Sequence, residues 1–426
     1  MLKLPRPHKV LLESGAVLLY QRNPVSSTNA FGVWIKSGSR DEMDSERGFS
    51  HFLEHLVFRG TRRRSALQIA LDLEEIGGAW DAFTGKESTC YHGKVLEEQF
   101  EVLVDVFSDI ISKPSIPKES LGLERKIIKE EIRSIKDSPE DLANEMFLKT
   151  VFKGHPLGNP VTGRISDISG CNRRDLVSFH KKRYTHPNTV FGYVGDLAVG
   201  SVTSILDGRF KLANGSPPTG SLGAAGNGGR IRSVVRPDLT QSHICIGSET
   251  VGASSPYRYP LLILSNAIGG GVSSRLFQSL RERTGLAYSV YSFTNFWQDT
   301  GVICFYFSVD PRNVGRAIEI FRAEMEAVRD GRLGDTEIKS AKAQAKAALI
   351  FGMENIENRL FRLFNCEFYL GGYVDPVKAI ADLEKVDADQ VAEASSKFLD
   401  ETKLSYVTCG PAAIRRVAAG IHGPRS

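Results

Sequence analysis

The chain repeats one order of secondary-structure patterns twice, and this repetition constrains its fold more than any other feature of the sequence. Residues 212–229 are rich in Gly, Ser and Pro and offer almost nothing to a hydrophobic core, so we expect them to connect two near-equal halves. In each half, strands and helices come in blocks instead of alternating. The pattern therefore predicts an α+β fold of two tandem homologous domains, each a mostly antiparallel sheet with helices packed on one side.

The predicted division is an N-terminal domain over residues 1–211, a linker over 212–231 and a C-terminal domain over 232–426. A length of 426 residues favours this division because it exceeds what one hydrophobic core usually supports. Periodicity in the first half predicts strands over 9–20, 30–36 and 79–95, and helices around His51 and over 65–76, 98–112 and 117–137. In the second half it predicts strands over 243–249, 287–293 and 302–309, and helices over 259–268, 274–283, 313–330 and 334–355.

Charge and composition exclude several classes of protein. The 54 Lys and Arg residues against 50 Asp and Glu give a formal charge of +4 without a basic block, so no nucleic-acid partner is expected. The sequence has no apolar run of about eighteen residues and no signal peptide, so no membrane association is expected. Six scattered cysteines without C-x-x-C spacing are typical of reduced core thiols. These features predict a cytoplasmic protein, and a cleaved transit peptide leaves a mitochondrial matrix location open.

The strongest chemical signal is the pattern H-x-x-E-H formed by His51, Glu54 and His55. On a helix, residues four apart share a face, so both imidazoles can be presented to one metal ion with the carboxylate beside them. The order is the reverse of the commoner H-E-x-x-H, and both orders place an acid next to water at the metal. The corresponding helix of the second half, around residues 261–266, contains no metal ligand. We therefore expect the N-terminal domain to be catalytic and the C-terminal domain to close over the substrate.

A catalytic zinc ion typically has three protein ligands and an open position for water, so a third ligand is required. Residues 123–135 read as an amphipathic helix that contains three candidate acids. Glu124 and Glu131 are seven residues apart and share one face of that helix. Glu130 is rotated by roughly 100° from Glu131 and does not easily serve the same ion. The spacing thus indicates the face that carries the ligand.

Taken together, these motifs resemble the pitrilysin/insulinase family of zinc metallopeptidases, particularly its shorter members such as mitochondrial processing peptidase and its bacterial relatives. The resemblance spans nearly the whole chain. It implies that Glu131, 76 positions after His55, is the third ligand of one zinc ion per chain, and that Glu124 supports a ligand without touching the ion. Further matching stretches are residues 37–42, 48, 58–61, 76–78, 82–84, 155–158 and 195–196.

Two further segments are predicted to hold the substrate. Residues 79–84 follow a Gly-Gly turn and read as an edge strand, which an extended peptide can join through main-chain hydrogen bonds; an interior strand is the alternative. The resemblance implies that Ala82 and Phe83 pair with substrate, and Asp81, where relatives usually have Asn, is expected to favour basic residues. It also implies that Arg281 and Tyr288 hold peptide carbonyls and stabilise the oxyanion, against the alternative of a solvated arginine and a core tyrosine.

The sequence therefore predicts a zinc-dependent endopeptidase that cleaves short or unfolded peptides in a clam-shell chamber. Presequence-like basic peptides are one candidate class of substrate. Glu54 is expected to act as the general base. The alternative is a non-catalytic or partner-dependent subunit of a processing-peptidase-like complex, because the family includes such chains. A homodimer is the expected assembly, and a heterodimer with a related inactive subunit is the second candidate.

Overall fold

The computed structural model describes residues 5–215 and 229–411. The chain forms two compact units, and each is assembled from three stretches of sequence. The first unit takes residues 1–133, 159–221 and 352–373, and the second takes residues 134–158, 222–351 and 374–426. Most of the predicted linker falls in 216–228, which lies outside the described residues. The sequential division at 212–231 stays a prediction.

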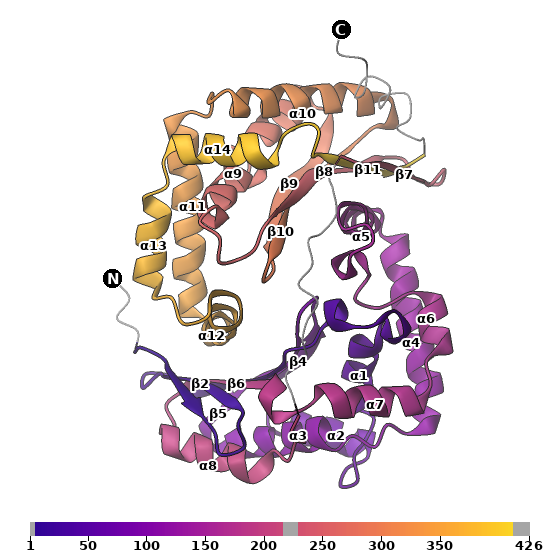
Figure 1. Ribbon diagram of the computed structural model, residues 1–426, viewed down its shortest axis with the longest axis vertical. Coiled ribbons are helices and arrows are strands. Elements are labelled where there is room, and N and C mark those ends of the chain that lie inside the picture. Colours follow the sequence, from indigo (N-terminus) through magenta and orange to yellow (C-terminus); the bar gives the residue numbers. More distant parts are fainter. Residues whose placement is uncertain (1–4, 216–228, 412–426) are drawn as a thin grey trace. The chain divides into compact units, whose positions relative to one another are not determined.

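The first unit is built on a six-stranded sheet in the order β1-β2-β6-β3-β5-β4. Figure 1 labels four of these strands, β2, β4, β5 and β6. Only the pair β2 and β6 is parallel. The strands are β1 (His8–Leu11), β2 (Val17–Arg22), β3 (Thr28–Ile35), β4 (Ala79–Thr84), β5 (Thr89–Leu96) and β6 (Thr189–Gly195). The main helices are α1 (Phe49–Val57), α2 (Ala66–Glu75), α3 (Phe100–Ser112), α4 (Lys118–Asp137, which ends in the second unit), α6 (Ile165–Gly170), α7 (Arg173–Arg183), α8 (Val199–Arg209) and α12 (Ile356–Leu370).

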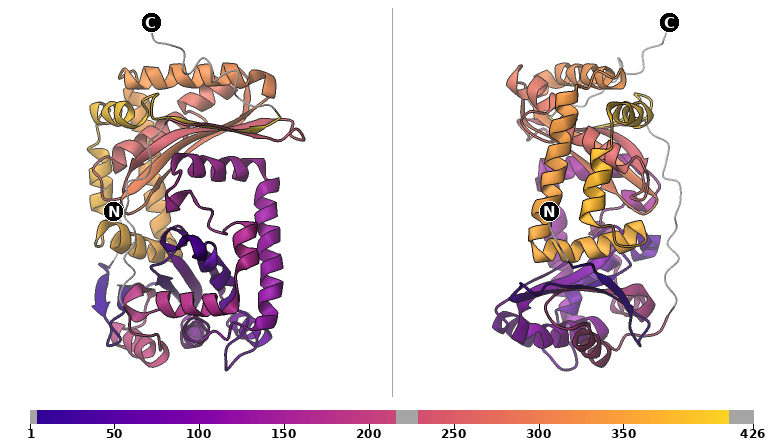
Figure 2. Two further views of the ribbon diagram at one scale, coloured as in Figure 1. Left: turned by 45° about the vertical axis from the view of Figure 1, so that its right-hand side comes forward. Right: turned by 90° about the vertical axis from the view of Figure 1, so that its left-hand side faces the viewer.

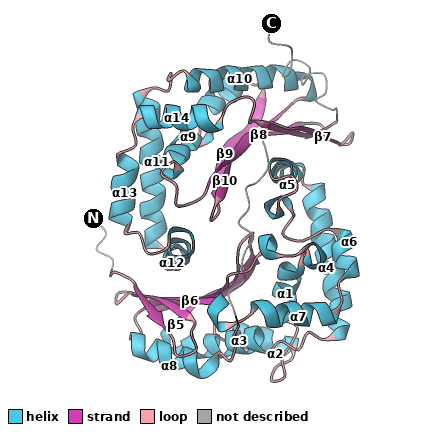
Figure 3. Cartoon of the chain, viewed as in Figure 1, coloured by secondary structure: helices cyan, strands magenta, loops and turns pink. Residues whose placement is uncertain are grey.

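The second unit is built on a five-stranded sheet in the order β7-β11-β8-β10-β9, again with one parallel pair, β7 and β11. Figure 3 shows the helices that accompany these strands. The strands are β7 (Ile231–Val235), β8 (Ser242–Val251), β9 (Ala287–Phe296), β10 (Thr300–Val309) and β11 (Ser405–Gly410). The helices are α5 (Pro139–Val151), α9 (Arg258–Gly269), a π-helix (Phe277–Glu282), α10 (Val314–Arg329), α11 (Asp335–Glu354), α13 (Pro376–Glu384) and α14 (Ala388–Phe398).

The α+β fold class is confirmed, and the structure adds a helix on the other face of each sheet. In the first unit, strand residues such as Phe31 and Tyr91 pack with α1 and α3, while Trp34 points to the opposite face. There it stacks on Phe364 of α12, with ring centroids 4.8 Å apart. Figure 2 shows α12, in orange-yellow, lying across the strands of this sheet. In the second unit, α5 covers β8 and β11 in the same way through Phe147. Each half of the sequence therefore contributes one helix to the sheet of the other half.

Two compositional expectations can be compared with the structure. All six cysteines are buried and none forms a disulfide, as expected for core thiols. Within residues 5–215 and 229–411, no helix combines the length and the apolar character that crossing a bilayer would need.

Candidate active site

Helix α1, which carries His51 and His55, is fixed at its start by the buried side chain of Glu42. It begins after Gly48, whose φ of 81° lies in the left-handed region that favours glycine. Both carboxylate oxygens of Glu42 accept backbone N–H groups at 2.8 Å, one from Gly48 and one from Ser50. Because the first N–H groups of a helix have no intrahelical partner, this contact stabilises the start of α1. Burial raises the pKa of Glu42 to about 8 against the lowering effect of these two hydrogen bonds.

The two histidines of α1 converge with Glu131 of α4. The rings of His51 and His55 have centroids 4.7 Å apart. The Nε2 atom of His51 lies 3.4 Å from Oε1 of Glu131, and Nε2 of His55 lies 3.8 Å from Oε2 of the same carboxylate. Glu54 completes the group, because ligand atoms of His51, Glu54 and His55 all lie within 4.8 Å of one another. The predicted ligands are thus brought together, with one Glu131 oxygen facing each imidazole.

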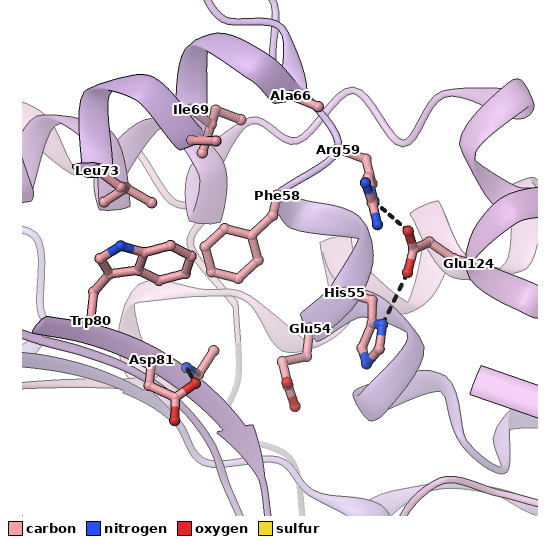
Figure 4. Close-up of a pocket in the computed structure, with 12 residues that line it drawn as sticks. Glu54, His55, Phe58, Arg59, Ala66, Ile69, Leu73, Trp80, Asp81 and Glu124 are labelled. Carbon is pink, nitrogen blue, oxygen red and sulfur yellow. Dashed lines mark hydrogen bonds and ion pairs between the residues drawn. The ribbon is translucent and has the colours of Figure 1, made fainter. Parts of the chain in front are cut away.

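Glu124 contacts Nδ1 of His55, the ring nitrogen that does not face Glu131. It is fully buried on α4, and its Oε2 lies 2.9 Å from Nδ1 of His55 while its Oε1 forms an ion pair with Arg59 (Figure 4). A carboxylate that accepts a hydrogen bond from Nδ1–H of His55 leaves the Nε2 lone pair of the ring to face a metal ion. Glu130 points away and pairs with Arg133. Three neighbouring acids on one helix therefore have different partners: Glu124 contacts His55 and Arg59, Glu130 pairs with Arg133, and Glu131 faces both imidazoles.

Electrostatics also favour a cation at this point. Burial lowers the pKa of His55, but the hydrogen bond with Glu124 and the charges of nearby carboxylates outweigh burial and raise it above its ordinary value. The hydrogen bond with His51 holds the pKa of Glu131 below its ordinary value. Three carboxylates, those of Glu54, Glu124 and Glu131, lie at this point, and the Arg59 guanidinium pairs with that of Glu124. Two imidazoles and a carboxylate are a ligand set that zinc prefers, so these residues fit a divalent zinc ion.

Strand β4 borders this group and is the terminal strand of its sheet, as predicted. Asp81 and Phe83 are exposed, and Asp81 accepts the N–H of Ala82 at 2.8 Å (Figure 4). On the helix side of the strand, Trp80 stacks on Phe58 with ring centroids 5.4 Å apart. These rings belong to a pocket of about 340 Å³ between α1, α2 and β4, lined mainly by apolar side chains and bordered by Glu54 and His55. The predicted substrate strand is therefore exposed beside the predicted metal ligands.

Arg281 and Tyr288 lie together in the second unit. The Arg281 guanidinium lies over the rings of Phe277 and Tyr288 and donates a hydrogen bond to the Tyr288 carbonyl at 2.7 Å. Arg281 is in the π-helix, a rare conformation that is frequent at functional sites. Tyr288 is 71% exposed, so the alternative of a core tyrosine is wrong. The roles of both residues toward substrate stay predictions.

Comparison with known proteins decides the family. Residues 17–164 match the model of the insulinase family, peptidase family M16, and residues 170–345 match that of the M16 inactive domain. An uncharacterized zinc protease of Mycobacterium leprae is 32% identical to the chain over 96% of the chain and 92% of that protein. The chain belongs to the M16 peptidase family. The relationship covers both halves of the sequence.

Solved structures agree with the fold of this M16 family member. A protease from Helicobacter pylori has a TM-score of 0.88 at 22% identity and covers 96% of the chain and 100% of that structure. An M16 inactive domain from Pseudomonas fluorescens has a TM-score of 0.87 at 19% identity, covering 96% and 98%. At these identities the likeness supports the shared architecture alone.

Three contacts of this M16 site escaped sequence reasoning, although their residues lie in stretches that match the family. They are the Glu42 contact with the start of α1, the Arg59 ion pair with Glu124, and a hydrogen bond from Thr84 to Glu54. The signal that the sequence offered for Glu42 was an acid shortly before a helix whose N-cap, Gly48, has no side chain to cap it. The other two contacts join distant segments and leave no periodic pattern.

Proposed function

We propose that the chain is a zinc-dependent endopeptidase acting on short or unfolded peptides. The observation that carries this proposal is the convergence of His51, His55 and Glu131, with the carboxylate of Glu54 beside them. The names of the relatives as zinc proteases support the same activity. A non-catalytic subunit would have no need of this complete set of residues.

The imidazole Nε2 atoms of His51 and His55 and the carboxylate of Glu131 would hold the ion, one per chain. Glu124 would keep both the tautomer and the orientation of His55 fixed. When bound, zinc supplies Lewis acidity and lowers the pKa of water toward neutrality. The chain's own contribution is a rigid arrangement of ligands on two packed helices.

Glu54 is proposed as the general base. Its carboxylate takes the proton from the attacking water and passes it to the amine that leaves when the peptide bond breaks. It is half-buried, so it can reach substrate while remaining fixed by its neighbours. Water attack and proton transfer therefore depend on one side chain placed next to the metal ligands.

The peptide is proposed to join β4 as an added strand at Asp81, Ala82 and Phe83. Main-chain pairing accepts many sequences, whereas pockets give specificity. The pocket walled by Phe58 and Trp80 supports the binding of an apolar side chain near the cut bond. Arg281 and Tyr288 are proposed to bind substrate carbonyls, on the strength of the family resemblance. A preference for basic residues near Asp81 and a homodimeric assembly belong to the same proposal.

A quenched-fluorescent peptide assay tests the activity. Purified protein should cleave the peptide, lose activity with a chelator and regain it with zinc. Glu54→Gln should keep the metal but lower kcat by roughly 10²- to 10⁴-fold, because general base catalysis is worth about that much. Glu74→Gln, an exposed acid near the end of α2, is the matched control and should behave like the parent. Cleavage that survives both chelation and Glu54→Gln would assign the protein to another class.

A further inference from the structure

The proposed base is held by the strand that is proposed to bind the peptide. Oγ1 of Thr84 donates a hydrogen bond to Oε2 of Glu54 at 2.5 Å. Thr84 is the last residue of β4, and Glu54 lies in the middle of α1. The contact spans two elements that are separated by thirty residues of sequence.

Strand geometry explains why Thr84 faces α1. Side chains alternate along a strand, so Trp80, Ala82 and Thr84 lie on one face of β4. Trp80 stacks on Phe58 of the segment that follows α1, and Ala82 packs against the core of the first unit. Thr84 is the one residue of the three with a hydroxyl group, and this hydroxyl contacts the Glu54 carboxylate.

A single segment ties the end of β4 to the start of α1. The backbone N–H groups of Ser39 and Arg40 donate to carbonyls of the turn after β4, at Gly85 and Lys86. Arg40 also forms a buried ion pair with Glu87 of the same turn at 2.6 Å. Two residues farther along, Glu42 receives the first N–H groups of α1. The relative position of Thr84 and Glu54 is therefore fixed from both sides.

We infer that Thr84 is a positioning residue for Glu54. Its hydroxyl holds one carboxylate oxygen, which leaves the other oxygen to accept the proton of the attacking water. Because Thr84 ends the strand that pairs with substrate, the peptide backbone and the base are positioned by the same strand. The inference rests on the proposed function, since it assigns a role within that reaction.

Two substitutions in the full chain test the inference. Thr84→Val keeps the shape of the side chain and removes the hydroxyl, so kcat should fall roughly ten- to a hundredfold, the usual worth of a hydrogen bond to a charged group. KM and zinc affinity, measured by competition with a chelator, should stay unchanged. Thr84→Ser retains the donor and should keep kcat within about threefold of the parent.

The matched control is Thr89→Val, at the position of β5 that pairs with Thr84. The Thr89 hydroxyl is buried and bonds to the Ser37 carbonyl, so its loss should lower Tm and leave kcat near that of the parent. In a Glu54→Gln background, Thr84→Val should have no further effect, because the two residues act as one unit.

The outcomes separate the two proposals. If the parent is active and Thr84→Val has the same kcat, the role of Thr84 is overturned and the proposed function is not. The same holds if Thr84→Ser is as slow as Thr84→Val. A loss of zinc affinity in Thr84→Val overturns that role as well, because the residue would then serve the metal ligands. A parent without metal-dependent cleavage overturns the proposed function and this inference with it.

Discussion

Five strands of each sheet follow the same order, yet among the described residues a candidate metal site lies beside only one of the sheets. The order β2-β6-β3-β5-β4 in the first unit corresponds to β7-β11-β8-β10-β9 in the second, with the parallel pair at the same place. Helix α1 packs near β4, and α9 packs near β9. Where α1 presents His51, Glu54 and His55, α9 presents mainly buried aliphatic side chains. The fold is therefore repeated in the second unit, but the candidate metal-binding side chains of α1 are not.

A polar contact between helix and edge strand occurs in both units. In the first unit it joins Glu54 to Thr84. In the second it joins Ser265 of α9 to Ser292 of β9, with the two hydroxyl oxygens 2.9 Å apart. The same place in the fold thus holds an ionisable acid in one unit and an uncharged hydroxyl in the other. Only the acid can take a proton from water near neutral pH.

The largest expected difference comes from removing a ligand. His51→Ala should lower both bound zinc and peptide cleavage to the level of chelated protein, because two remaining ligands hold the ion weakly. Ser265→Ala in the corresponding helix should leave both unchanged. Elemental analysis and the peptide assay measure these quantities. Equal losses in the two variants would show that the contrast between the units is wrong.

A smaller effect is expected from the support of His55. Glu124→Gln keeps a hydrogen-bond acceptor but removes the charge, so zinc affinity should fall roughly 10- to 100-fold, as is usual for residues that orient a metal-ligating histidine. Glu130→Gln on the same helix is the control, since Glu130 is exposed and pairs with Arg133. Competition with a chelator measures the zinc affinity of both variants. If Glu130→Gln lowered the zinc affinity as much as Glu124→Gln does, Glu124 would have no special role.

The effect expected to change peptide cleavage least is a pH dependence of stability. Helix α7 packs on α1 and holds His180, whereas α14, which packs on α9, has no histidine. Burial lowers the pKa of His180 to about 4, although its hydrogen bond to the Ile111 carbonyl opposes this. Because the folded-state pKa lies below the ordinary value of 6.5, stability is complete above pH 6.5 and is lost as pH falls toward 4. The loss is on the order of 3 kcal/mol.

His180→Gln removes this titration. Between pH 6.5 and pH 4, the Tm of the variant should therefore fall less than the Tm of the parent. Thermal unfolding over this range measures both. Parallel curves would contradict a neutral, buried His180.

Much of the fold was predictable because local periodicity encodes single elements. The helix expected over 259–268 is found as α9, and the strands expected over 287–293 and 302–309 are β9 and β10. The segment expected as a helix over 274–283 is a π-helix for six residues, a change of winding that apolar spacing does not record. The placement of α5 and α12 on the sheet faces opposite to the other helices was not predictable. An amphipathic helix reveals that it packs, but not which sheet it packs on.

The sequence by itself determined that His51, Glu54 and His55 share one side of a helix, since spacings of three and four residues from His51 fix this within one element. It also determined that Glu124 and Glu131 share one face of a second helix. Only the tertiary structure decided that Glu131 faces both imidazoles, that Glu124 bridges His55 and Arg59, and that Thr84 holds Glu54. Contacts between distant segments depend on how helices and strands pack, and no spacing along the chain encodes that packing.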